Sequence, residues 1–185
     1  MILNSYGIYK GSRNASWQCL LDYHIDRLPV TVSQIIRSAG IRLLDNSEVE
    51  ILPLHQSGQS LSRKGLWTII IDDKDTPQRQ RFTMAHELGH IFLGHGETGS
   101  YTAEEETAAN VFASRLLAPA CVLWALDIHD AQDIQKLCDI SLTAATIRAE
   151  RMQVLYERNK FLASSLEQQV YRQFLPFIQS FKKSK

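Results

Sequence analysis

A nine-residue stretch near the middle of the chain reads Phe82-Thr83-Met84-Ala85-His86-Glu87-Leu88-Gly89-His90 and contains the pattern H-E-x-x-H. Residues four apart lie on one face of a helix, so the imidazoles of His86 and His90 can hold one metal ion. Glu87 points to one side of that pair, where it can accept a proton from a water on the metal. Two ligands do not hold a catalytic zinc, so the rest of the chain must supply a third.

The third ligand is predicted in the acidic segment that follows. Glu104, Glu105 and Glu106 are all acceptable zinc ligands by their chemistry. Glu105 completes a capping box with Thr102, and Glu104 points away from the core. Glu106 lies three residues before Ala109 and shares its apolar helix face. A solvated acidic turn that favours the helix dipole explains Glu104 and Glu105, but not a glutamate on the apolar face, so we predict Glu106 as the ligand.

Other side chains are candidates for supporting roles. Asn110, four residues after Glu106, is placed to hydrogen-bond the outer nitrogen of a zinc histidine. Peptide hydrolysis also needs a donor that stabilises the developing oxyanion. The sequence does not single out that donor, and the candidates are His95, Tyr101 and His55.

The composition narrows the class of protein. The chain has 20 Lys and Arg against 20 Asp and Glu, and a net charge of zero argues against nucleic acid as the main partner. Its three cysteines, Cys19, Cys121 and Cys138, are odd in number and widely spaced, as in a reduced cytosolic protein. We see neither a signal peptide nor an apolar run that could span a bilayer, and we expect a cytoplasmic protein without a membrane partner.

Local patterns predict a short series of strands followed by helices. The first dozen residues are expected to be irregular, and residues 56–60 and 96–101 to be loops. Strands are predicted at residues 41–44, 49–54 and 66–72. Helices are predicted at residues 17–28, from Thr31 or Ser33 to Gly40, from Pro77 to near Gly94 or Gly96, from Thr102 to Leu117, after Pro119, from Asp130 to Leu137, and from Ser141 toward Asn159.

These elements indicate an α+β protein. We expect a small sheet in the N-terminal half, packed on a mainly helical, zincin-like core with the H-E-x-x-H helix and a following glutamate-bearing helix. A single domain is expected over residues 1–160, with the zinc core at about residues 66–119. Residues 161–185 are expected to form a helical or partly flexible tail.

The segment Ile134–Met152 resembles a helix-turn-helix in outline, with residues 138–141 at the turn. Its charges are mixed, and they comprise Lys136, Arg148 and Arg151 against Asp133, Asp139 and Glu150. A helix that enters the major groove should be more basic. We therefore favour a packing or substrate-docking helix pair over a DNA-binding element.

Several motifs together indicate a family. The first covers the strand Trp67–Asp72 and the stretch Arg81–His90. The second reads Glu106-x-x-Ala109-Asn110-x-Phe112-Ala113-x-x-Leu116-Leu117-x-Pro119, and the third reads Ile140-Ser141-x-x-Ala144-Ala145-x-x-Arg148. With these motifs the chain resembles the ImmA/IrrE-type zinc metallopeptidases (M78, DUF955). The resemblance covers about half of the chain and is most specific between Trp67 and Pro119.

The resemblance implies that His86, His90 and Glu106 bind Zn²⁺ and that Glu87 is the catalytic glutamate, a gluzincin-like arrangement. Members of the family typically act beside a helix-turn-helix repressor, often of a phage or mobile element. The resemblance therefore implies a metallo-endopeptidase that cleaves a transcriptional repressor. The alternative is a non-proteolytic, zinc-containing regulatory module that binds and inactivates a repressor.

Overall fold

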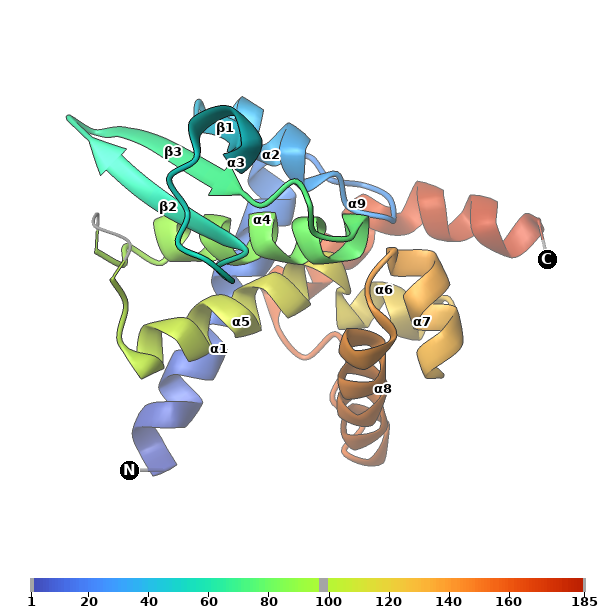
Figure 1. Cartoon of the computed structure of the whole chain (residues 1–185). Helices are drawn as coiled ribbons and strands as arrows, with labels where there is room; N and C mark the ends of the chain where they lie inside the picture. Colours follow the sequence, from blue (N-terminus) through green and yellow to red (C-terminus); the bar gives the residue numbers. More distant parts are fainter. Residues whose placement is uncertain (1, 97–99, 185) are drawn as a thin grey trace. The chain divides into compact units, whose positions relative to one another are not determined.

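The computed structural model describes residues 2–96 and 100–184, and it confirms the α+β class (Figure 1). The strands are β1 (Arg42–Asp45), β2 (Gly58–Arg63) and β3 (Leu66–Ile71). The helices are α1 (Ile2–Asp22), α2 (Val32–Ser38), α3 (Asn46–Val49), α4 (Pro77–Phe92), α5 (Ala103–Leu117), α6 (Ala120–Ala125), α7 (Ala131–Cys138), α8 (Leu142–Glu157) and α9 (Ser165–Lys183).

The chain divides into two compact units. The N-terminal unit comprises Met1–Ala15 and Thr31–Ala113, and the C-terminal unit comprises Ser16–Val30 and Ser114–Lys185. The expected domain of residues 1–160 with a tail at 161–185 stays a prediction.

The sheet of the N-terminal unit has the strand order β1-β3-β2. The central strand β3 pairs in parallel with β1 and antiparallel with β2, and its residues 69–71 are buried. Lys64 and Gly65 both have positive φ, of 53° and 77°, as a two-residue hairpin turn between β2 and β3 requires. The predicted strand at residues 66–72 is confirmed, and β2 forms an edge of the sheet.

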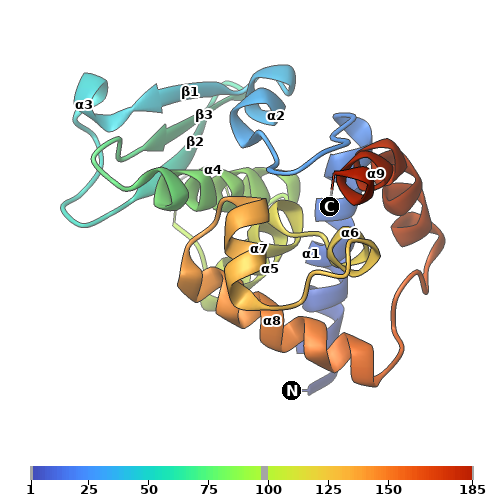
Figure 2. The ribbon, with the colours of Figure 1, turned by 90° about the vertical axis from the view of Figure 1, so that its right-hand side faces the viewer.

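Helix α4 packs against β2 and β3 of this sheet (Figure 2). Its start is defined by Thr76, whose side chain accepts a hydrogen bond from the Arg79 backbone N–H, and by Pro77 in the first turn. Gly94 follows the helix with a φ of 71°. The helix predicted from the spacing of H-E-x-x-H is therefore present, with its ends where the capping residues place them.

Helix α5 begins with the predicted capping box. The Glu105 carboxylate accepts a hydrogen bond from the Thr102 backbone N–H at 2.8 Å, and the Thr102 hydroxyl accepts one from the Glu105 backbone N–H at 3.3 Å. Gly89 of α4 faces Phe112 of α5, and a Cβ at Gly89 would lie 3.0–3.2 Å from that side chain. Glycine therefore permits the close approach of these two helices.

Within the C-terminal unit, α6 contacts α9 and α7 contacts α8. Asp130 and Ser141 cap α7 and α8 through their side chains, as predicted. The side-chain amide of Gln173 on α9 donates hydrogen bonds of 2.7 Å to the carbonyl oxygens of both Leu20 and Ile25.

Several predicted elements were wrong. Residues 2–12 are helical, although Gly7 and Gly11 each cost a helix about 1 kcal/mol, because packing that buries Ser12 and Ser16 overrides local propensity. That helix ends at Asp22, and His24 follows with a φ of 53° that no helix continues. Of the predicted loop at residues 96–101, residues 97–99 lie outside the described part of the chain.

The region between β1 and β3 also differs from the prediction. A strand was expected at residues 49–54, but the Asn46 side chain accepts hydrogen bonds from the backbone N–H groups of Ile51 and Leu52. Those donors are therefore satisfied locally rather than by a neighbouring strand. The expected loop at residues 56–60 contains the start of β2 at Gly58, which pairs with Ile71.

Among the described residues, the stretch Ala103–Ala125 is long and apolar enough to cross a membrane by length and composition alone. However, 72% of its most apolar window is buried inside the protein. Such burial is typical of a core helix of a soluble protein.

Replacing Gly89 by Ala is expected to lower the free energy of unfolding by about 1–3 kcal/mol, because the new methyl group overpacks the contact with Phe112. The measurement is urea unfolding followed by circular dichroism. Gly11→Ala is the control, since a Cβ at Gly11 meets no heavy atom of the described residues within 4 Å. It should be neutral or stabilising by up to about 1 kcal/mol. Equal stability of both variants would contradict the packing role of Gly89.

Candidate metal centre

Three predicted ligands converge from two helices of the N-terminal unit. The Nε2 atoms of His86 and His90 on α4 lie 3.0 Å apart. Glu106 on α5 brings one carboxylate oxygen to 3.2 Å from His86 Nε2 and the other to 3.8 Å from His90 Nε2. Among the residues that the structure describes, this is the one group of three His, Cys, Asp or Glu side chains whose ligand atoms all lie within 4.8 Å of one another.

The protonation of both histidines suits a metal ligand. Burial lowers the pKa of His90 to about 3, with a smaller contribution from the charge of His86. Burial also lowers the pKa of His86, against the opposing effects of Glu106 and of the hydrogen bond with Asn110. Both imidazoles are therefore neutral at pH 7, and neutral imidazole is the form that binds metal ions.

The outer nitrogens of the two imidazoles each have a partner. His86 Nδ1 lies 3.1 Å from the Asn110 side-chain oxygen, and His90 Nδ1 lies 2.8 Å from His95 Nδ1. Partners of this kind orient a ligating histidine and leave its inner nitrogen free for the metal. Two neutral nitrogens and one carboxylate that point to a common centre fit a zinc ion with an open fourth position.

Glu87 lies beside the three ligands and is not one of them. Its side chain is only 5% exposed, and its Oε2 atom accepts a hydrogen bond of 2.7 Å from the Ser60 hydroxyl on β2. Burial raises the pKa of Glu87 to about 7, although the hydrogen bond with Ser60 acts in the opposite direction. The carboxyl group can therefore both accept and release a proton near neutral pH.

The three candidate oxyanion donors have different surroundings. The Tyr101 ring stacks on His90, with 3.5 Å between ring centroids and 15° between planes, and its hydroxyl lies 2.8 Å from Ser60 Oγ. His95 contacts the outer nitrogen of His90. His55 is exposed and does not line the pocket beside Glu87. The structure thus brings Tyr101 and His95 to the centre, but not His55.

The sequence-based reasoning missed Ser60. It falls in a stretch that was expected to be a loop, and its contact with Glu87 depends on the pairing of β2 with β3. The placement of Glu106 also differs in one respect from the expected apolar face. Its side chain is 46% exposed, because it faces a pocket that opens to solvent.

That pocket has a volume of about 300 Å³ and is mainly polar. Gln56, Gln59 and Arg79 line it together with two of the candidate ligands, His86 and Glu106. The Arg79 guanidinium donates a hydrogen bond of 3.0 Å to the Ser57 hydroxyl. The polar lining surrounds the open side of the centre.

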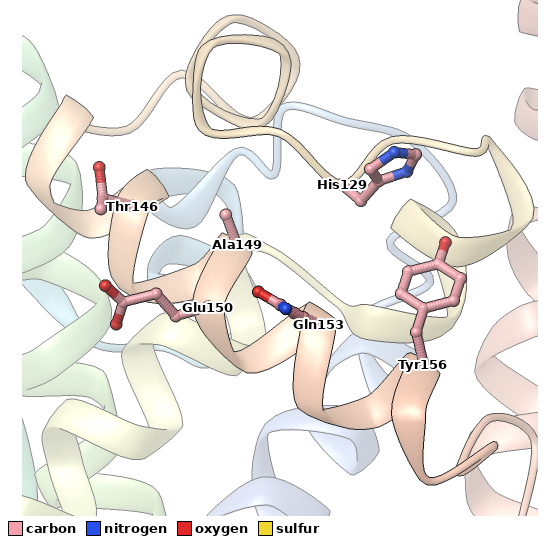
Figure 3. Close-up of a pocket in the computed structure, with 6 residues that line it drawn as sticks. All are labelled: His129, Thr146, Ala149, Glu150, Gln153 and Tyr156. Atoms are coloured by element: carbon pink, nitrogen blue, oxygen red, sulfur yellow. The ribbon is translucent and has the colours of Figure 1, made fainter.

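A second pocket, of about 460 Å³, lies in the C-terminal unit and contains none of the predicted site residues. Figure 3 shows its lining, with Tyr156 projecting from α8 toward His129. The two rings meet edge to face with centroids 5.8 Å apart. This pocket has no metal-binding group among the described residues.

Residues 45–156 match the model of peptidase family M78, described as the IrrE N-terminal-like domain. The chain belongs to this family. The matched region is more than half of the chain, and it contains the three ligand candidates and Glu87. No curated protein matches the sequence. Membership in family M78 confirms the resemblance and supports a metallopeptidase-family role.

The raised pKa of Glu87 predicts a distinct pH dependence of stability in the metal-free protein. Between pH 4.5 and about 7 the folded chain keeps a proton on Glu87 that the unfolded chain has released. Its contribution to stability therefore falls as the pH rises through this range. Between pH 4.5 and 7 the free energy of unfolding of the wild type should fall by on the order of 2–3 kcal/mol relative to that of Glu87→Gln. The measurement is urea unfolding at each pH.

In the same experiment the lowered pKa of His90 changes the stability of the metal-free protein in the opposite direction. The pKa of His90 is about 3 in the folded chain and about 6.5, the ordinary value of histidine, in the unfolded chain. Its contribution to stability therefore rises with pH over that interval. Because His90 is present in both proteins, its contribution largely cancels in the comparison. Parallel stability curves for wild type and Glu87→Gln would contradict the raised pKa of Glu87.

Proposed function

We propose that this member of family M78 is a zinc-dependent endopeptidase. The observation that carries the proposal is the combination of three converging ligands with a buried carboxylate that is not a ligand. A purely structural metal site needs no such additional carboxylate and is closed by protein ligands. Here two of the candidate ligands, His86 and Glu106, line a polar pocket together with Glu87, which leaves room for a substrate.

His86, His90 and Glu106 hold the zinc ion in this proposal. When bound, zinc supplies Lewis-acid chemistry, because it polarises a carbonyl group and lowers the pKa of a water to about 7. Asn110 orients the imidazole of His86 through the hydrogen bond at its outer nitrogen.

Glu87 acts as general base and then as general acid. Its carboxylate accepts a proton from the attacking water and delivers it to the nitrogen of the departing amine. Its second carboxylate oxygen, Oε1, is available for this transfer while Oε2 is held by Ser60. A group that exchanges a proton twice in one cycle works best with a pKa near the working pH, and in the metal-free protein burial already raises the pKa of Glu87 to about 7.

The proposed substrate is a helix-turn-helix transcriptional repressor of a phage or mobile element. Support for this choice comes from the kind of partner beside which members of the family typically act. The proposed location is the cytoplasm, in agreement with an odd number of widely spaced cysteines, all of them buried.

Substitution of the ligands is expected to remove zinc. His86→Ala and Glu106→Gln should each fail to retain one equivalent of zinc after dialysis, because two ligands do not hold the ion. Asn110→Ala should retain zinc with an affinity lower by about 10–100-fold. The measurement is metal analysis with chelator competition. Glu104→Gln is the matched control, since Glu104 is an exposed residue of the same helical turn. Zinc retained by Glu106→Gln at the control level would contradict the ligand set.

Glu87→Gln is expected to keep zinc and to lose cleavage by a factor of at least about 100, because glutamine cannot accept the proton. Wild type and variant are incubated with repressor-like proteins encoded beside the gene, and products are read by intact mass. A fragment formed only by the wild type supports the proposal. Cleavage retained by Glu87→Gln would refute it. Repressor inactivation without any fragment, in both proteins, would instead indicate a non-proteolytic binding module.

A further inference from the structure

We propose that Ser60 is a positioning residue whose hydroxyl fixes both the Glu87 carboxylate and the Tyr101 ring. The inference deepens the proposed peptidase function and rests on it for the catalytic role of Glu87. The hydrogen bonds themselves are independent of that function.

Ser60 is held rigidly in the sheet beside α4. It is fully buried and lies opposite Ile69 in the pairing of β2 with β3. Gly58, two residues earlier, lies on the same face of β2. A Cβ at Gly58 would collide with the Thr83 side chain and would lie 3.6 Å from Glu87 Cγ. The missing side chain at Gly58 therefore lets β2 come close enough to α4 for the Ser60 hydroxyl to reach Glu87.

The direction of each hydrogen bond follows from the groups involved. An ionised carboxylate only accepts, so the Ser60 hydroxyl donates to Glu87 Oε2 over 2.7 Å. The single hydrogen of Ser60 then points to Glu87, so the Tyr101 hydroxyl donates to Ser60 Oγ over 2.8 Å, with the Ser60 carbonyl oxygen as a longer second acceptor at 3.4 Å. The result is a chain from Tyr101 through Ser60 to Glu87, in which each bond strengthens the next.

This chain of hydrogen bonds has two consequences for the metal centre. Glu87 keeps one carboxylate oxygen on Ser60 and presents the other to the reaction. The Tyr101 hydroxyl donates its hydrogen to Ser60, so that hydrogen is not available to an oxyanion while these hydrogen bonds are intact. The same bond holds the Tyr101 ring over His90, where the rings stack at 3.5 Å. Because a misplacement of about 1 Å in a catalytic group can cost about 100-fold in rate, we expect Ser60 to affect turnover.

The first test compares Ser60→Ala, Ser60→Thr and the matched control Ser62→Ala in cleavage of the repressor substrate. Ser62 lies on the same strand, and among the described residues its buried hydroxyl has no hydrogen-bond partner. Ser60→Ala should lower kcat by about 10–100-fold with KM within about twofold and zinc content unchanged. Ser60→Thr restores a hydroxyl and should recover most of kcat, and Ser62→Ala should match the wild type.

Three outcomes of this test would overturn the proposal: an unchanged kcat in Ser60→Ala, an equal loss in Ser62→Ala, or a loss of zinc or folding in Ser60→Ala. The last would show that Ser60 supports the fold rather than the position of Glu87.

The second test does not depend on activity. Crystal structures of zinc-loaded wild type, Ser60→Ala and Ser62→Ala are compared at the metal centre. In Ser60→Ala we expect the Glu87 carboxylate to adopt another rotamer or several, and the Tyr101 ring to leave its stacked position on His90. Superimposable Glu87 and Tyr101 side chains in all three proteins would overturn the proposal. If the wild type cleaves no repressor, the peptidase function fails, and this comparison still decides the role of Ser60.

Discussion

The metal centre depends on the close approach of α4 to two neighbours at once. On one side β2 reaches α4 because Gly58 has no side chain to collide with Thr83, and on the other α5 reaches α4 because Gly89 leaves room for Phe112. The first contact brings Ser60 to Glu87, and the second brings Glu106 to the two histidines. Since close-packed interiors transmit small displacements, each glycine affects the site without touching a metal or substrate.

Burial gives His86, His90 and Glu87 their chemical character. A neutral imidazole is less costly to bury than a charged one, and a protonated carboxyl less costly than a carboxylate. Burial therefore favours the metal-binding form of His90 and raises the pKa of Glu87 to about 7. In the metal-free protein the two effects on stability oppose each other between pH 4.5 and 6.5. The arrangement thus prepares the ligands for a cation and makes Glu87 an effective acceptor near neutral pH.

Sequence patterns predicted those parts of the fold that local chemistry determines. Thr76, Pro77 and Gly94 delimit helix α4, and the capping box begins α5. Within each helix the sequence spacing then determines which face carries the predicted ligands. Strand β2 has no comparable local signal, because Gly58-Gln59-Ser60 contains no β-branched or aromatic residue. It forms through antiparallel pairing with β3, the strongly apolar strand that follows it across the Lys64-Gly65 turn. Ser60 could therefore not be assigned to the site from the sequence.

The side chains of the candidate metal centre differ in their exposure to solvent. Glu87 and His90 are almost fully buried, and Glu87 also lines the polar pocket. Glu106 is 46% exposed and faces the same pocket. Rigid placement matters most for groups that move a proton, because their geometry sets the rate. Access matters most where a substrate would enter, and among the candidate ligands Glu106 is the one that solvent reaches most readily.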